Sequence, residues 1–429
     1  MSKPTCLDTF CVLPWLHRFT NIGGEIQVCC TSEESDNNVR DDDGNTLNAS
    51  QKLDDEKIMN SLFMKNLRLK MMKNEWPDLC FRCKVTEESG GISRRISENL
   101  RHQREIHQLL GEIAPDGGIP LRLRSIDYRL GNQCNLACRM CNPRASSRWI
   151  GEWRKVHQSL FVMSDSQERE YRNYDWYQSP HLVTQLRAAL PSLTSMHFAG
   201  GEPLIIPEML TLLKECVDSG YAGNIDLSYN TNLTYLPPAI KTLWPHFRKV
   251  RLLCSVDAFG PVNEFIRYPS KWKVIDRNLR DIDAHFQEYG VTEVNIMCTV
   301  QVYNVFKLGE LFDYVAENFK WICPIPHLVD LHYPDYYRTQ ILPPELKSQA
   351  RAHLMETAER TQKRLEKGSI HATHGFLLDS LRGSLNFLSM EDLQHRIPAF
   401  MHASSSKDAN RRQRLFDVIP ELAPLAGQT

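Results

Sequence analysis

The chain has 429 residues, enough for roughly three domains or for one large α/β barrel with attachments. Its 51 Lys and Arg residues balance 52 Asp and Glu residues, which excludes a bulk electrostatic attraction to nucleic acid or to an anionic membrane. No apolar run approaches the roughly 18 residues of a membrane span, and the first residues lack an export-signal pattern, so we expect a cytoplasmic protein.

Cysteine usage points to metal chemistry in the first third of the chain. The sequence contains 13 cysteines, and nine of them precede residue 142. An odd number of cysteines without an export signal favours metal ligands and reduced thiols over a disulfide framework.

The N-terminal segment FCVLPWLHRFTNIGGEIQVCC predicts a β-hairpin. Alternating apolar residues flank the turn Asn21–Gly24, whose glycines permit a positive φ. Such a hairpin would place Cys11 and Cys29 on neighbouring strands. Cys30 would leave its strand on the opposite face and is the spare cysteine.

A second pair of cysteines follows an acidic, polar stretch over residues 31–56, which we expect to be a loop. Helical spacing of apolar residues predicts an amphipathic helix over Ile58–Met72 that ends near Trp76. Cys80 and Cys83 come directly after that break. With the two hairpin cysteines they supply four thiolates, which suit either an iron–sulfur cubane or a closed zinc site.

A further helix over Glu88–Leu110 ends at the turn 115–118, where we place a domain boundary. Beyond it, short β-rich runs alternate with helical patterns, which is typical of parallel strands joined by helical crossovers. The predicted strands are Ser125–Leu130, Ser195–Ala199, Ile225–Tyr229, Val250–Val256, Glu293–Val302 and His327–Leu331. The expected α/β fold is a partial (β/α)6 TIM barrel over residues 119–335, with a small N-terminal α+β cluster domain (1–118) and a helical C-terminal extension (336–429).

Three cysteines lie in one loop after the first barrel strand, where the sequence reads CNLACRMC. Cys134, Cys138 and Cys141 offer three thiolates, which leave one coordination position open for chemistry. The spacing resembles the radical S-adenosylmethionine (radical SAM) superfamily, although Met140 stands where most members carry an aromatic residue. The resemblance implies a [4Fe-4S] cluster whose unique iron chelates S-adenosyl-L-methionine. A zinc knuckle or three buried free cysteines is the alternative interpretation.

Other matches to the family's cofactor site follow later predicted strands, at the end of the barrel where active sites lie. They are Gly200, Gly201, Glu202 and Pro203, then Asn230, and then Ser255 and Arg267. The resemblance implies that strand-edge carbonyls and Glu202 take the methionine ammonium, that Ser255 touches the ribose, and that Arg267 pairs with the carboxylate. Asn230 either meets the cofactor or makes local backbone bonds.

The N-terminal cysteines resemble the SPASM/twitch auxiliary-cluster motif, because twelve residues separate Cys11 from Gly24 and four more precede Cys29. Most such domains follow the barrel, so the chain looks like the subset with an N-terminal cluster. The resemblance implies a second [4Fe-4S] cluster, a flavodoxin- or ferredoxin-type reductant and a peptide substrate. A small-molecule substrate (a sugar, nucleoside or amino acid) is the enzymatic alternative, and a zinc-binding interaction module without catalysis is the alternative of a different class.

Two regions carry no motif of their own. The stretch 158–180, an insertion before the second barrel strand, contains Tyr171, Tyr174, Trp176 and Tyr177. These aromatic residues predict either a lid over the barrel mouth or an insertion that packs on the rest of the protein. Beyond residue 335 we expect helices that close or line the open side of the barrel, with no chemistry.

Overall fold

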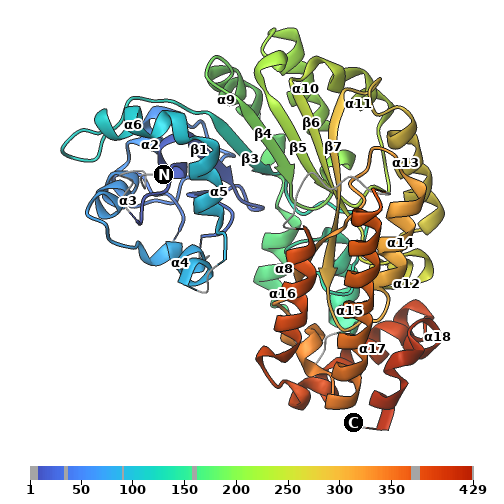
Figure 1. The fold of residues 1–429 in the computed structure, drawn as a ribbon. Coiled ribbons are helices and arrows are strands. Elements are labelled where there is room, and N and C mark those ends of the chain that lie inside the picture. The colour runs from blue at the N-terminus through green and yellow to red at the C-terminus, as the bar shows by residue number, and fades with distance from the viewer. Residues whose placement is uncertain (1–7, 33–36, 89–90, 157–161, 369–376, 428–429) are drawn as a thin grey trace.

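The structure, a computed structural model, describes residues 8–32, 37–88, 91–156, 162–368 and 377–427. Its centre is one eight-stranded sheet in the order β2-β1-β3-β4-β5-β6-β7-β8, curved as in a partial barrel (Figure 1). All neighbouring strands run parallel except β1 and β2. The strands are β1 (His17–Thr20), β2 (Ile26–Gln27), β3 (Ser125–Arg129), β4 (Ser195–Ala199), β5 (Asp226–Thr231), β6 (Lys249–Ser255), β7 (Val291–Val300) and β8 (His327–Asp330).

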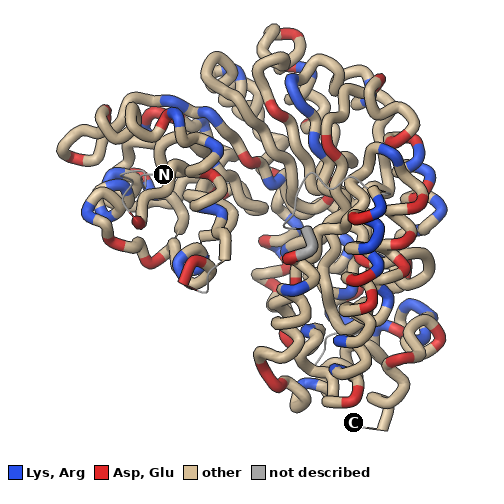
Figure 2. Tube along the Cα trace, viewed as in Figure 1, with Lys and Arg blue, Asp and Glu red and all other residues tan. Residues whose placement is uncertain are grey.

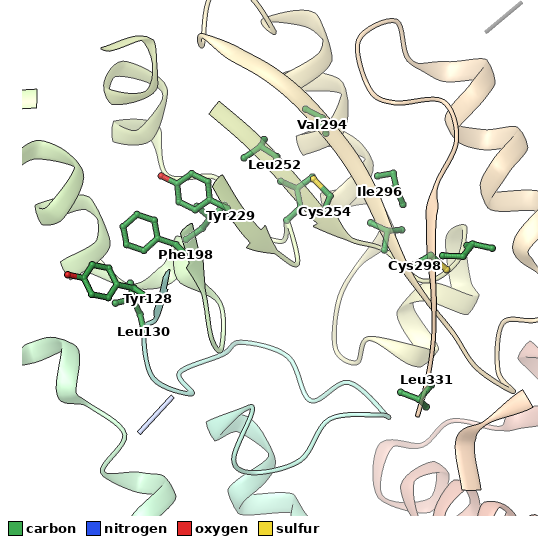
Figure 3. Packing of buried hydrophobic residues seen from close by; sticks show 14 of the residues in the cluster. Tyr128, Leu130, Phe198, Tyr229, Leu252, Cys254, Val294, Ile296, Cys298 and Leu331 are labelled. Atoms are coloured by element: carbon green, nitrogen blue, oxygen red, sulfur yellow. The ribbon is translucent and has the colours of Figure 1, made fainter. Parts of the chain in front are cut away.

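The strands β3 to β8 confirm the six predicted barrel strands, with bounds that differ by at most two residues. Within β4 to β7, buried residues alternate with residues that are partly or fully exposed. Phe198, Tyr229, Leu252 and Ile296 belong to the buried set, which forms a continuous apolar layer (Figure 3). The alternation therefore separates a helix-covered outer face from an open inner face.

Helices on the outer side connect the parallel strands (Figure 1). In α10, Met209, Leu212, Leu213 and Cys216 are buried, which is the stripe expected of a helix that packs on a sheet. A proline at its first position suits the helix start, because that position needs no backbone donor. The barrel helices are α7 (Ile150–Val156), α8 (Asp165–Arg172), α9 (Leu182–Ala189), α10 (Pro207–Asp218), α11 (Pro238–Leu243), α12 (Gly260–Ile266), α13 (Trp272–Ala284) and α14 (Leu308–Asn318).

The N-terminal region packs beside β3, and its first strand continues the barrel sheet. The helices are α1 (Leu13–Leu16), α2 (Asp55–Met59), α3 (Leu62–Met72), α4 (Phe81–Glu88), α5 (Arg94–Arg101) and α6 (Gln103–Gly111). The predicted helix over 58–72 is two helices, because Ser61 caps the second with its side chain. The hairpin forms with Phe19 opposite Gln27, but α1 separates Cys11 from β1, so the prediction that Cys11 and Cys29 lie on neighbouring strands is wrong. The domain boundaries at residues 118 and 335 stay predictions.

The C-terminal region is helical and covers the other edge of the sheet. Its helices are α15 (Pro344–Glu366), α16 (Leu377–Met390), α17 (Ile397–Arg411) and α18 (Leu415–Val418). Helix α16 packs against β8, and α17 packs against α7 near the carboxyl ends of the strands (Figure 1). Among the described residues, no helix has both the length and the apolar character that a membrane crossing needs.

Candidate active site and auxiliary cysteine site

The cysteine loop that follows β3 is held by backbone contacts to distant segments. The amide of Ala137 donates to the carbonyl of Tyr268 at 2.6 Å, and the amide of Arg139 donates to the carbonyl of Ile266 at 2.8 Å. The indole of Trp149 donates to the carbonyl of Cys138 at 3.0 Å. The loop therefore has a defined shape before any ligand is bound.

The structure brings together the three cysteines that the sequence singled out. Burial raises the pKa of Cys134 to about 12, and the nearby Cys138 adds to the rise. A hydrogen bond from the Cys141 thiol lowers the pKa of Cys138 and raises the pKa of Cys141, whose burial acts in the same direction. Buried thiols that oppose one another's ionisation favour binding of a cation, which compensates the thiolate charges.

Three cysteine thiolates are the donor set of this loop. No group of three or more His, Cys, Asp or Glu side chains in the described part of the chain is arranged to hold a single metal ion. Three thiolates would fill three of the four cysteine positions of a [4Fe-4S] cluster and leave one iron open.

The glycines after β4 let that strand end pack against the cysteine loop. A Cβ atom on Gly201 would lie 2.1 Å from the carbonyl oxygen of Gln133, and Gly200 has a φ of +118°. The amide of Gly201 donates to the carbonyl of Gly131 at 2.9 Å. These two positions therefore require glycine for a close backbone approach, and Pro203 begins the short 3-10 turn that follows.

Glu202 is buried and ties the end of β4 to the end of β5. Its carboxylate accepts hydrogen bonds from the Thr231 hydroxyl at 2.7 Å, the Asn232 amide at 2.6 Å and the Leu204 amide at 3.1 Å. Burial raises the pKa of Glu202 to about 7, although these donors favour the ionised form. The side chain thus has a structural task that the sequence did not reveal, and its contact with an ammonium group stays a prediction.

Two asparagines near the end of β5 have different surroundings: Asn230 lies within the strand, and Asn232 follows it. Asn230 is exposed on the open inner face, and Ser255 of β6 is half-exposed on the same face. Asn232 is buried, and its side-chain amide donates to Asn135 at 2.9 Å and lies 3.9 Å from the Cys134 sulfur. Asn232, rather than Asn230, therefore contacts the cysteine loop.

Arg267 forms a buried ion pair with Asp257, at 2.8 Å between Nε and Oδ2. Asp257 also accepts a hydrogen bond from the Thr299 amide at 2.9 Å. Burial opposes the guanidinium charge, but Asp257 and the thiols of Cys138 and Cys141 outweigh it and raise the pKa of Arg267. A permanent positive charge therefore stands beside the cysteine loop.

The C-terminal helix α17 supports the loop from outside, which no sequence motif indicated. Arg411 donates to the carbonyl of Ala137 at 2.8 Å and pairs with Glu152 of α7 at 2.7 Å. Arg139, within the loop, pairs with Asp408 of α17. The C-terminal extension is helical, as expected, and α17 in addition fixes the loop that carries the proposed chemistry.

The aromatic excursion divides into a packed part and a part that lines a cavity. Trp176 and Tyr177 are buried, and the Tyr177 hydroxyl donates to Gln133 at 3.0 Å. Tyr171, together with Met163, lines a cavity of about 270 Å³ beside the cysteine loop and Tyr333. Residues 158–161 of the predicted excursion lie outside the described residues.

The four N-terminal cysteines line a second, smaller cavity. Burial raises the pKa of Cys11, with further rises from Cys29, Cys80 and Cys83. Burial also raises the pKa of Cys80 to about 12, again with contributions from Cys29 and Cys83. Cys80 ends the 3-10 turn Asp78–Cys80, and Cys83 lies in the first turn of α4, which follows that turn directly. The four thiols thus converge although the hairpin geometry differs.

Comparison with known proteins gives one family match. Residues 128–300 match the Radical SAM superfamily. No curated protein matches the sequence significantly.

Three solved structures show limited similarity. The structure titled "Native anSMEcpe with bound AdoMet and Cp18Cys peptide" is 18% identical, with a TM-score of 0.38 over 58% of this chain and 62% of that chain. Streptococcus suis SuiB bound to precursor peptide SuiA is 13% identical, with a TM-score of 0.35 over 79% of this chain and 71% of that chain. TYW1 with a lysine-pyruvate adduct bound is 13% identical, with a TM-score of 0.29 over 63% of this chain and 90% of that chain. The chain therefore spans less than two thirds of the anSMEcpe chain.

The match shows that residues 128–300 form a domain similar to the Radical SAM superfamily.

Proposed function

We propose that the protein cleaves S-adenosyl-L-methionine reductively and uses the resulting 5′-deoxyadenosyl radical to abstract hydrogen from a peptide. The observation that carries the proposal is the gathering of Cys134, Cys138 and Cys141 in one rigid loop beside Arg267, inside the radical SAM domain. When bound there, a [4Fe-4S] cluster with one open iron would supply the electron and the site for the cofactor.

The remaining residues of the site would hold and orient the cofactor. Arg267 is proposed to bind the methionine carboxylate, because its guanidinium has donors beyond those directed at Asp257. Asn230 and Ser255 stand on the open inner face, where a nucleoside could reach them. Gly200, Gly201, Glu202 and Pro203 would shape the strand edge that receives the ammonium.

The N-terminal cysteines are proposed to hold a second [4Fe-4S] cluster. Four convergent thiols fill the cluster's shell, so that site would transfer electrons or anchor substrate rather than cleave the cofactor. The same four thiolates could in principle close a zinc site, which is the alternative that metal analysis decides.

A peptide is the proposed substrate because auxiliary sites of this kind accompany peptide modification in the enzymes that the sequence resembles. A small organic substrate is the second choice. A low-potential protein such as a flavodoxin or ferredoxin is the proposed electron donor.

The test compares the full-length protein with a variant in which Cys134, Cys138 and Cys141 are all replaced by Ala. After anaerobic reconstitution and reduction with dithionite, the variant should form no 5′-deoxyadenosine and should lack about four iron atoms per chain. Cys216→Ala is the matched control, since Cys216 is buried in α10 and belongs to neither group of proposed ligands. Undiminished 5′-deoxyadenosine in the triple variant would show that the proposal is wrong.

The same triple variant tests the N-terminal site. About four iron atoms per chain should remain, and their Mössbauer spectrum should be that of a cubane. Zinc, or no metal, would instead leave a one-cluster enzyme with a structural N-terminal region.

A further inference from the structure

The inner face of the sheet is polar and open, unlike the apolar outer face. The inward residues of β4, β5 and β6 include Ser195, His197 and Ser228, which are partly buried, and Asn230 and Arg251, which are exposed. Basic and acidic residues both occur along the strands (Figure 2). A face that served only as core would be apolar, so these side chains have room to contact a ligand.

Strand register aligns five of the polar side chains across the inner face. The paired residues form one row, in the order Asp127, His197, Ser228, Arg251 and Glu293. A hydrogen bond of 2.8 Å joins His197 Nδ1 to the Ser228 hydroxyl and fixes the imidazole ring. Arg94 of α5 pairs with Asp127 at 3.8 Å, so the negative charge at that end of the row is compensated.

Two arginines on this face lack an acidic partner among the described residues. Arg129 of β3 lies over the Phe19 ring at 5.1 Å, and its Nε is buried without an acceptor. Arg251 of β6 is exposed and forms no ion pair with Glu293, its register neighbour, whose carboxylate accepts from Asn295 at 2.6 Å. Two uncompensated guanidinium groups on one concave surface favour an anionic ligand.

The pKa of His197 responds to the charges of both Arg129 and Arg251. Burial lowers the pKa of His197, Asp127 opposes this change, and Arg94, Arg251 and Arg129 lower the pKa further. Arg94 is paired with Asp127, which leaves the charges of Arg251 and Arg129 near the imidazole without an acidic partner among the residues that the structure describes. An anion bound there would neutralise the arginines and accept hydrogen bonds from both.

Arg129 lies close to the start of the cysteine loop. Arg129 ends β3 five residues before Cys134, and its register partner Ala199 directly precedes Gly200. A ligand held by Arg129 would thus lie just beneath the loop, where hydrogen abstraction is proposed. Glu293, which forms no ion pair among the described residues, lies at the other end of the row and favours a single negative charge over a doubly charged phosphate.

We propose that Arg129 and Arg251, on either side of His197, bind a carboxylate of the peptide substrate. The inference rests on the proposed function for its substrate class. The carboxylate belongs to an acidic side chain or to a chain terminus, and the two sources are separated by the probes below.

The test measures probe binding to the anaerobically reconstituted full-length protein by calorimetry. The probes are the peptides acetyl-Ala-Glu-Ala-amide, acetyl-Ala-Gln-Ala-amide and acetyl-Ala-Ala-Ala with a free carboxylate, together with inorganic phosphate. A carboxylate-bearing peptide should bind at least about tenfold more tightly than the Gln peptide, as expected for a charge-assisted contact. Whichever carboxylate peptide is preferred identifies the source.

Arginine variants test which residues cause the preference for carboxylate peptides. Arg251→Gln and Arg129→Gln should each abolish the preference, Arg251→Lys should retain part of it, and Lys214→Gln on the outer helix α10 should leave it unchanged. Iron content and melting temperature verify that each variant is folded, and two arginine positions keep the test valid if one variant fails to fold.

Three outcomes would overturn the inference: equal binding of the Glu, Gln and free-carboxylate peptides, a preference that survives both Arg→Gln variants, or tighter binding of phosphate than of either carboxylate. Formation of 5′-deoxyadenosine by the wild-type protein without substrate is measured separately. If no 5′-deoxyadenosine forms, the proposed function is contradicted, whereas the anion site is still tested by the calorimetric binding of the peptide probes.

Discussion

Replacement of Arg411 by Met should destabilise the protein and loosen the cysteine loop. The side chain of Arg411 is 1% exposed and that of Glu152 is 12% exposed, so the two form a buried ion pair. Two contacts join them, at 2.7 Å and 3.1 Å, and a third from Arg411 reaches the carbonyl of Ala137 at 2.8 Å. The variant leaves Glu152 buried without its partner, which costs about 3–5 kcal/mol of unfolding free energy.

The double variant Arg411→Met/Glu152→Met separates the ion pair from the loop contact. An apolar pair of similar volume often restores the stability of a buried ion pair, so the remaining loss should be that of the Ala137 carbonyl, about 1–3 kcal/mol. Arg412→Met is the control, because Arg412 is exposed and forms no ion pair within the described residues. That substitution should change stability by no more than about 0.5 kcal/mol.

The assay is urea unfolding under anaerobic conditions, followed by tryptophan fluorescence and iron content. Trp149 is a suitable reporter because the Arg411 guanidinium lies 4.7 Å from the centroid of its ring. If Arg411→Met unfolds within about 1 kcal/mol of wild type, or if Arg412→Met is equally harmful, then α17 does not support the loop and the reasoning fails.

Three further predictions concern single residues of the two cysteine sites. Arg267→Ala should weaken cofactor binding about ten- to a hundredfold in equilibrium dialysis, because a charge-assisted contact is worth about 1.5–3 kcal/mol; unchanged affinity would make the residue purely structural. Glu202→Gln should remove a pH dependence of the unfolding free energy. The pKa of this carboxyl rises from 4.5 to about 7 on folding, so the protonated group stabilises the folded protein at low pH and this stabilisation is lost as the pH rises through 7. In urea unfolding, the wild type should therefore lose about 2–3 kcal/mol of unfolding free energy relative to the variant between pH 5 and pH 8. Cys30→Ala should retain the full iron content, since the Cys30 thiol meets Arg94 and does not line the four-cysteine cavity; loss of about four irons would make it a ligand.

The barrel strands could be predicted because their pattern is local. In β6, Val250, Leu252 and Cys254 are buried while the residues between them are not, and this alternation is visible in the sequence. The three cysteines after β3 and the glycines after β4 were likewise found from short spacings.

What the sequence did not reveal depends on contacts between distant segments. Arg139 and Asp408 are separated by 269 positions, and although Arg139 lies within the cysteine motif, no spacing in the sequence indicates that Asp408 is its partner. The hairpin prediction failed at Cys11 for a local reason, since Pro14 suits the first turn of a short helix and delays the strand to His17. Arg129 and Arg251 were invisible as a pair because only the sheet register brings them to one face.

Helix α5 connects the N-terminal cysteine site to the inner face of the sheet, which bears on the role of that site. Its neighbouring residues Arg94 and Arg95 diverge: Arg95 pairs with Glu87 and donates to the carbonyl of Phe10, beside the four-cysteine cavity, whereas Arg94 reaches Cys30 and Asp127 on the inner face of the sheet. The four-cysteine cavity, which both arginines help to line, therefore borders the surface that carries the proposed anion site. A purely structural metal clip could lie anywhere in the N-terminal region. A site that abuts the substrate face is better placed to exchange electrons with a substrate or to hold it, and for that reason the position of α5 favours a functional auxiliary cluster over a structural one.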